Sequence, residues 1–246
     1  MMISVRIFAG VLLAFSSLFA GPHVTAAATP SEMLAQMRAA HGGEALMSLT
    51  SARMRLYTRN PGDKLPHVAD MHYDFQNKAI AKEETSEGGL ERKIAGAGRG
   101  YSFIGGHCAP LPEAEENRMM RSLYSNFLFL LSDSQTILAP ADPGAPTTAP
   151  YAGLDWYNIY RPGWKGFHIG IDPETSLISA LWFGGKSYGR EFEYRRIDGV
   201  MWPFRFEMYE GEKLVSSGHF SDLVFSRTGD DEIKVPDYCM QLLTPQ

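Results

Sequence analysis

The chain has 246 residues, a net charge of −5 and a sequence pI of about 5.8. Its 23 basic residues are scattered among 28 acidic ones rather than gathered in one stretch. This distribution excludes the electrostatic footprint of a nucleic-acid-binding protein and a polybasic patch for a membrane surface. We therefore predict no nucleic-acid partner.

Residues 1–28 have the features of a signal peptide. Arg6 supplies a positive charge, residues 7–21 form an apolar run, and Ala26-Ala27-Ala28 supplies small residues for cleavage. The run is shorter than the roughly 20 residues that span a bilayer, so a cleaved leader is favoured over an uncleaved anchor. The mature protein, residues 29–246, is predicted to be one domain, soluble and periplasmic.

A short amphipathic helix is predicted at the start of the mature chain. The segment Thr29-Pro30-Ser31-Glu32 combines an N-cap residue, a proline at the first helical position and a capping box. Apolar residues follow at helical spacing until Gly42-Gly43, which should end the helix. His41, in the last turn, is expected to favour the helix dipole as a surface cation.

Residues 53–104 read as short strands, of which we expect four or five. The clearest alternation places Met71, Tyr73 and Phe75 on one face and the intervening polar residues on the other. This part of the chain therefore predicts a sheet with one apolar face.

Residues 113–132 interrupt the strands with one predicted helix. An acidic first turn is followed by apolar residues at helical spacing, among them Met120 and Leu131. The part from residue 127 to residue 131 is apolar on every side, so it must be buried on most sides. An apolar sheet face is the expected place. The proline-rich residues 139–150 are predicted to be a surface connection.

Residues 165–225 predict five strands of a curved antiparallel sheet. Turn signals lie at residues 172–174, 183–186, 198–199 and 210–212. The large residues that alternate onto one face of these strands include Phe167, Ile169, Phe192, Trp202, Phe204 and Phe206. Because this face is large, aromatic and apolar, something must cover it.

The chain has two cysteines, Cys108 and Cys239. In an oxidising compartment they are expected to form a disulfide, which would close a loop of roughly 130 residues. Two separate buried thiols are the alternative, and the spacing does not exclude them.

Two segments resemble those of the periplasmic LolA-like proteins. They are Ala39-Ala40-His41-Gly42-Gly43-Glu44-Ala45 and Ile197-Asp198-Gly199-Val200-Met201-Trp202-Pro203-Phe204-Arg205, and the order of helices and strands also agrees. The resemblance implies a mainly β fold: one curved antiparallel sheet of about eleven strands forms an unclosed barrel. The N-terminal and mid-chain helices would cover its concave face. It further implies a hydrophobic cavity between sheet and helices, which the LolA, LolB and LppX groups use to hold acyl chains.

Together, the residues and the resemblance predict a periplasmic carrier or chaperone for a lipid or the acyl chain of a lipoprotein. The content of 14 Phe and 12 Met suits a cavity that accepts a chain of variable shape. Such a carrier is expected to be a monomer that passes its cargo to membrane-bound delivery partners. The expected ligand-binding residues are Met71, Tyr73, Phe75, Met120, Phe127, Leu131, Phe167, Ile169, Phe192, Trp202, Phe204 and Phe206.

The leading alternative is an exported sensor or interaction module whose barrel is filled by its own side chains. The sequence has no G-x-S-x-G elbow and no histidine pair with metal-ligand spacing. We therefore predict no enzymatic activity, no metal and no cofactor. A hydrolase with a Ser-His contact at the mouth of the sheet is a third possibility.

Overall fold

The structure is a computed structural model that describes residues 28–86, 89–96, 100–142, 144–146, 151–237 and 239. The predicted signal peptide lies outside the described residues up to residue 27. Within them, thirteen strands form one antiparallel sheet that is not closed into a barrel, in the order β6-β5-β4-β3-β2-β1-β13-β12-β11-β10-β9-β8-β7.

The sheet contains both halves of the chain, which meet where β1 pairs with β13. Its strands are β1 (Ser51–Arg59), β2 (His67–Asp74), β3 (Ala79–Ser86), β4 (Gly89–Ala95), β5 (Tyr101–Ile104), β6 (His107–Pro110), β7 (Ile137–Pro140), β8 (Asp155–Arg161), β9 (Trp164–Ile171), β10 (Ile178–Trp182), β11 (Ser187–Ile197), β12 (Val200–Glu210) and β13 (Lys213–Ser226). The helices are α1 (Pro30–His41), α2 (Glu44–Met47), α3 (Glu113–Tyr124) and α4 (Phe127–Ser132).

The five strands predicted for residues 165–225 are confirmed as β9 to β13, with breaks at the four predicted turns. The sheet has more strands than the eleven expected. Its two edge strands, β6 and β7, have only four residues each, too few to show an alternation in the sequence. Each ends in a proline, Pro110 or Pro140, a residue that sheets tolerate at their edges.

The prediction of one helix over residues 113–132 was wrong, because α3 and α4 are separate helices. Asn126 lies between them and caps α4. Its side-chain oxygen accepts hydrogen bonds from the backbone N–H groups of Leu128 and Phe129, at 3.0 and 3.4 Å. Asparagine at an N-cap satisfies donors that a helix start leaves free, so it favours a new helix over continuation of the old one.

Helix α1 begins and ends where predicted. The capping box of Thr29 and Glu32 is present, and Gly42 ends the helix with a φ of 137°. A Cβ atom at Gly42 would lie 2.8 Å from the carbonyl oxygen of Gly199 in the turn between β11 and β12. Glycine therefore lets the end of α1 approach this turn closely.

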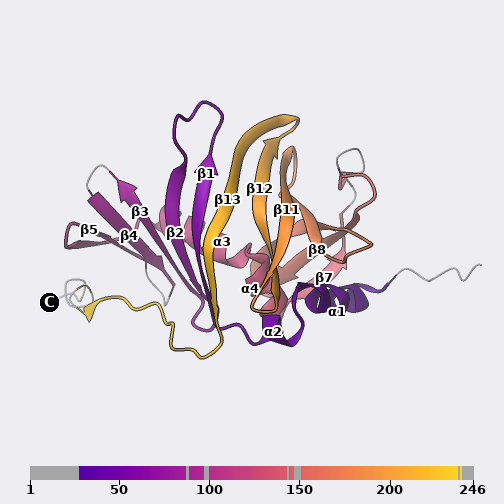
Figure 1. Cartoon of the computed structure of the whole chain (residues 1–246), viewed down its shortest axis with the longest axis horizontal. Helices are drawn as coiled ribbons and strands as arrows, with labels where there is room; N and C mark the ends of the chain where they lie inside the picture. The colour runs from indigo at the N-terminus through magenta and orange to yellow at the C-terminus, as the bar shows by residue number, and fades with distance from the viewer. Residues whose placement is uncertain are drawn as a thin grey trace, which may run out of the picture.

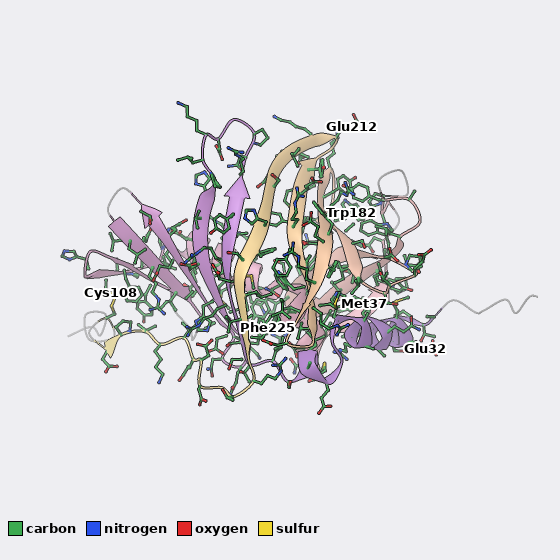
Figure 2. All side chains as sticks on the ribbon, in the orientation of Figure 1. Glu32, Met37, Cys108, Trp182, Glu212 and Phe225 are labelled. Atoms are coloured by element: carbon green, nitrogen blue, oxygen red, sulfur yellow. A yellow bond between two sulfur atoms is a disulfide. The ribbon has the colours of Figure 1, made fainter. Side chains whose placement is uncertain are left out.

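Helices α3 and α4 lie on one side of the sheet in Figure 1, α3 behind the strands towards β3 and β4, and α4 behind β12 and β11. Apolar side chains from the helices and the sheet form one large buried cluster. Figure 2 shows side chains gathered behind the central strands, with Phe225 of β13 and Met37 of α1 labelled. The helices thus cover the apolar face that the strand pattern predicted.

The C-terminal segment after β13 runs below β1 to β4 in Figure 1 and crosses to the strands at that edge. Ile233 packs against Ala81 and Ile94, on the sheet face opposite the helices. The segment is joined to β6 by a disulfide between Cys108 and Cys239, whose Cα atoms are 5.7 Å apart. Part of β3 and β4 is therefore covered on both faces.

Candidate functional site

Helix α4 is buried along its length against the apolar face of the sheet. Its residues from Phe127 to Leu131 are each at most 5% exposed. A helix of six residues is too short to be stable by itself in water, so its contacts with the rest of the protein must hold it. The apolar face and α4 together define the candidate site.

The ring of Phe127, the first residue of α4, lies among aromatic side chains from two other elements. It stacks on Trp202 of β12 with ring centroids 5.0 Å apart. The imidazole of His41, at the end of α1, meets the same ring edge-on at 5.4 Å. Phe127 therefore fills a position between the sheet and α1.

The C-terminal end of α4 is held by Arg38 of α1. The guanidinium donates hydrogen bonds from Nε to the carbonyl oxygen of Leu131 and from Nη2 to that of Asp133, both at 2.9 Å. These carbonyls are among those that the end of a helix leaves without partners, and a cation there also favours the helix dipole. Arg38 thus adds polar contacts that hold α4, whose other contacts with the protein are mostly apolar.

His41 is fully buried, and the expectation that it acts as a surface cation was wrong. Burial lowers the pKa of His41 to about 4, despite a hydrogen bond at 2.9 Å between Nδ1 and the carbonyl oxygen of Met37. The imidazole is therefore neutral at neutral pH. The sequence pattern missed this because the residues that bury the ring come from α4 and β11, far along the chain.

Phe192 of β11 was predicted to lie on the apolar face, but it lies on the opposite face, and its neighbour Glu191 is directed inward instead. The Oε2 atom of Glu191 is buried without a hydrogen-bond partner, and burial raises the pKa of this carboxyl to about 8. The ring of Phe192 instead lies under the guanidinium groups of Arg190 and Arg205, at 5.9 and 5.1 Å. Glu193 has a φ of 57°, which breaks the alternation between the two halves of the strand.

The first turn of α3 is held by charges rather than by apolar contacts. Lys93 of β4 forms ion pairs with Glu115 of α3 at 2.7 Å and with Glu91 at 3.3 Å. Burial lowers the pKa of Lys93, but hydrogen bonds and charges of these two carboxylates outweigh it and raise the pKa. The helix face of the sheet therefore carries charged side chains at β3 and β4, next to the buried Ile80 and Ala95, and is apolar beneath α4.

An open hollow of about 440 Å³ borders the C-terminal end of α4. Apolar side chains of Leu49, Phe75 and Phe129 line one part of it, and Asp133 and Arg161 line another. Arg161 is buried and pairs with Asp133 at 2.9 Å. The hollow therefore provides a route from solvent to the end of α4.

The structure brings most of the predicted ligand-binding residues together. Eight belong to the buried apolar cluster: Met71, Tyr73, Phe75, Phe127, Leu131, Phe167, Ile169 and Trp202. Met120 and Phe204 are partly buried against it. Phe192 and Phe206 lie outside it, although Phe206 contacts the ring of Phe220 at 5.5 Å.

Sequence reasoning missed the polar residues of the site. Arg38, His41 and Glu191 contribute their polar groups to an apolar region, and no local motif marks them. The one available signal was their position on elements whose other faces are apolar. That signal is weak, because most polar residues on such elements are simply exposed to solvent.

No protein-family model and no curated protein matches the sequence. Among solved structures, a LolA superfamily protein from Nitrosomonas europaea aligns with a TM-score of 0.50 and 10% identity, over 86% of this chain and 97% of that one. A DUF1329 family protein from Desulfovibrio piger aligns with a TM-score of 0.49 and 9% identity, over 80% and 92%. Lipoprotein LppX from Mycobacterium tuberculosis aligns with a TM-score of 0.35 and 14% identity, over 85% and 100%.

The first of these alignments, together with the unclosed antiparallel sheet and its helical cover, shows that the chain has a LolA-like fold. Within the described part of the chain, no helix is long and apolar enough to cross a bilayer. The same residues contain no group of three or more His, Cys, Asp or Glu side chains placed to hold a metal ion.

Proposed function

We propose that this protein is a periplasmic, non-enzymatic carrier that holds a lipid or the acyl chain of a lipoprotein between the sheet and its helical cover. The observation that carries the proposal is the nature of α4. It is a separate six-residue apolar helix lying on an apolar sheet face. A hydrocarbon chain can make the same kind of contact with that face, so α4 and a ligand can exchange places.

The energies of such an exchange are of similar size. Exposing the five buried side chains of α4 would cost roughly 7.5 to 15 kcal/mol, at about 1.5–3 kcal/mol for each large apolar side chain. Burying an acyl chain of about a dozen methylenes contributes on the order of 10 kcal/mol. Because the two terms nearly cancel, a ligand can enter without a large net cost, and α4 closes the site when the ligand leaves.

The break at Asn126 supports this exchange, because α4 can move without unwinding α3. The hollow beside Phe129 reaches the C-terminal end of α4 and suits ligand entry. The proposal also agrees with the LolA-like fold that the chain shares with a LolA superfamily protein. In this proposal the mature chain, residues 29–246, is one soluble domain that acts as a monomer and delivers its cargo to membrane-bound partners.

The second candidate is an exported sensor or interaction module that keeps its interior filled. The close stacking of Phe127 on Trp202 favours this candidate, because it leaves the position between sheet and α1 occupied by protein. The two candidates differ in whether α4 leaves the sheet when lipid is offered.

Native mass spectrometry and lipid extraction of protein from its own compartment test the proposal. We expect a bound lipid, and we expect added fatty acids to raise the melting temperature. The Arg38→Met variant loses two charge-assisted hydrogen bonds to the end of α4, so a fluorescent fatty acid should enter roughly ten times faster. Arg59→Met is the matched control, because Arg59 donates at 3.0 Å to a backbone carbonyl in an exposed hairpin.

The proposal fails if no lipid is recovered, fatty acids leave the melting temperature unchanged, and both arginine variants behave as the wild type. That combination would favour the sensor module.

A further inference from the structure

A carboxylate follows directly on the buried apolar segment of α4. It belongs to Asp133, the C-cap residue of the helix, and the five apolar residues that begin the helix are all buried. α4 and its cap therefore consist of an apolar stretch that ends in one carboxylate. A single-chain lipid with an acidic end group has its apolar and charged parts in the same order.

The ionic partner of this carboxylate belongs to the sheet. Oδ2 of Asp133 lies 2.9 Å from Nε of Arg161, the last residue of β8. Arg161 is 6% exposed, and its guanidinium lies over the rings of Tyr124 and Phe129, at 5.4 and 5.7 Å. Nη2 also donates to the amide oxygen of Gln135 at 2.6 Å, but a neutral amide does not compensate the charge. A buried cation of this kind needs an anionic partner.

The ion pair borders the open hollow of about 440 Å³ at the C-terminal end of α4. Among the described residues that line this hollow, Asp133 has the only carboxylate, whereas Arg161 and Lys78 are cations. Arg38 brings a third cation close, since its Nη2 donates to the backbone carbonyl of Asp133 at 2.9 Å. The surroundings of the hollow thus favour an anion, and the hollow opens to solvent.

An exchange of α4 for a ligand separates the two partners of the ion pair. Asp133 moves with α4, whereas Arg161 stays on β8. A neutral ligand would leave the buried guanidinium without an anion, which offsets part of the gain from burying the alkyl chain. A ligand with an acidic end group supplies the missing anion.

We propose that Arg161 binds the anionic end group of a single-chain lipid, in the place that the carboxylate of Asp133 holds when α4 covers the sheet. This inference rests on the proposed carrier function and assigns a charge to its ligand. The alkyl chain lies on the apolar face that α4 leaves, and the end group lies in the hollow. α4 with Asp133 thus occupies the site as an internal substitute for the ligand.

The test compares three probes with the same alkyl chain on the mature protein, below the concentrations at which they aggregate: dodecanoate, methyl dodecanoate and dodecyltrimethylammonium. Competition with bound Nile red gives the three dissociation constants. Dodecanoate should bind about 10 to 100 times more tightly than the ester, the range for a hydrogen bond to a charged group, and the ammonium probe most weakly. In an apolar cavity without a cation the ester would bind more tightly than dodecanoate, because a carboxylate loses more hydration.

The variant that removes the site carries Arg161→Met and Asp133→Asn together. It leaves neither charge buried alone, so it should retain more stability than either single substitution. We expect the ester to bind this variant at least as tightly as dodecanoate. Arg55→Met with Asp70→Asn is the matched control, because this exposed ion pair at 2.7 Å does not line the hollow. The control should keep the wild-type order of affinities.

The order of the three affinities in the wild-type protein needs no variant and already decides the assignment. If the ester binds the wild type as tightly as dodecanoate or more tightly, the anionic end group is overturned and the carrier function still stands. A preference for dodecanoate that persists in the double variant would also overturn the role of Arg161. Binding of none of the three probes would overturn both the end group and the carrier function.

Discussion

The two helices of the cover, α3 and α4, both bury apolar side chains in the same cluster, Met119 and Leu123 among those of α3, but only α3 is also attached to the sheet by ion pairs of residues within the helix. The first turn of α3 is held at the N-terminal strands by Lys93 and its carboxylate partners. α4 is held at the central and C-terminal strands by five buried apolar side chains and by Arg38. Ion pairs require particular partners in a particular geometry, whereas an apolar face accepts any apolar group that fits.

This difference indicates that α3 and α4 have different roles in covering the sheet. The ion pairs of Lys93 hold the first turn of α3 against β4. The C-terminal segment, which the disulfide joins to β6, covers part of the opposite face of β3 and β4. The region under α4 can exchange one apolar partner for another. Four substitutions probe this comparison, from the largest expected effect to the smallest.

Leu131→Ala tests the apolar attachment of α4. Leu131 is fully buried, so the substitution should lower the free energy of unfolding by about 2–5 kcal/mol. Urea unfolding measures the change. Leu65→Ala is the control, because Leu65 is 78% exposed and its truncation should cost less than about 0.5 kcal/mol. Equal costs at the two positions would mean that α4 is not held by burial.

Glu191→Gln tests the buried carboxyl near the apolar region. The pKa of Glu191 is about 8 in the folded protein against an ordinary value of 4.5, so the folded state retains a proton that the unfolded state loses. The free energy of unfolding should therefore fall as the pH rises from 4.5 to about 8. The slope from this group is about 1.4 kcal/mol per pH unit.

Chemical unfolding across that pH range should show this slope in the wild type and a flatter profile in Glu191→Gln. The exposed Glu193→Gln, two positions along the strand, serves as the control and should keep the wild-type slope. Parallel profiles of the wild type and Glu191→Gln would contradict the burial of this carboxyl.

Lys93→Met tests the ionic attachment of α3. The substitution leaves the carboxylates of Glu91 and Glu115 without their cation and should cost roughly 1–3 kcal/mol at low salt. The cost should shrink towards about 1 M salt, where the screening length is about 3 Å. Lys234→Met removes an exposed ion pair with Glu232 and should change little. A cost independent of salt would show that packing of the lysine stem, not charge, holds α3.

Thr29→Ala tests α1, the helix that presents Arg38 and His41 to α4. Loss of the capping box should lower the free energy of unfolding by about 1 kcal/mol. Gln36→Ala, at an exposed position of the same helix, should have a smaller effect. If the two variants unfold at the same urea concentration as the wild type, the cap contributes nothing to the stability of the protein.

Several features of the fold could be predicted from the sequence because their causes are local. The capping box of Thr29, the turn residues between β9 and β13, and the alternation of Met71, Tyr73 and Phe75 each depend on residues within a few positions of one another. The same local signals placed an apolar segment at residues 127–131 that needed burial. They therefore determined where the helical segments lie, though not the break at Asn126, as well as most of the strands and the apolar character of the covered face.

The polar part of the site was decided only by the tertiary structure. The hydrogen bond from Arg38 to Leu131 joins residues 93 positions apart, and the neutral state of His41 depends on rings from α4 and β11. The inward position of Glu191 goes with the local conformation of Glu193, whose φ is 57°. Desolvation is set by all the atoms that surround a group, and a linear pattern shows only the neighbours along the chain.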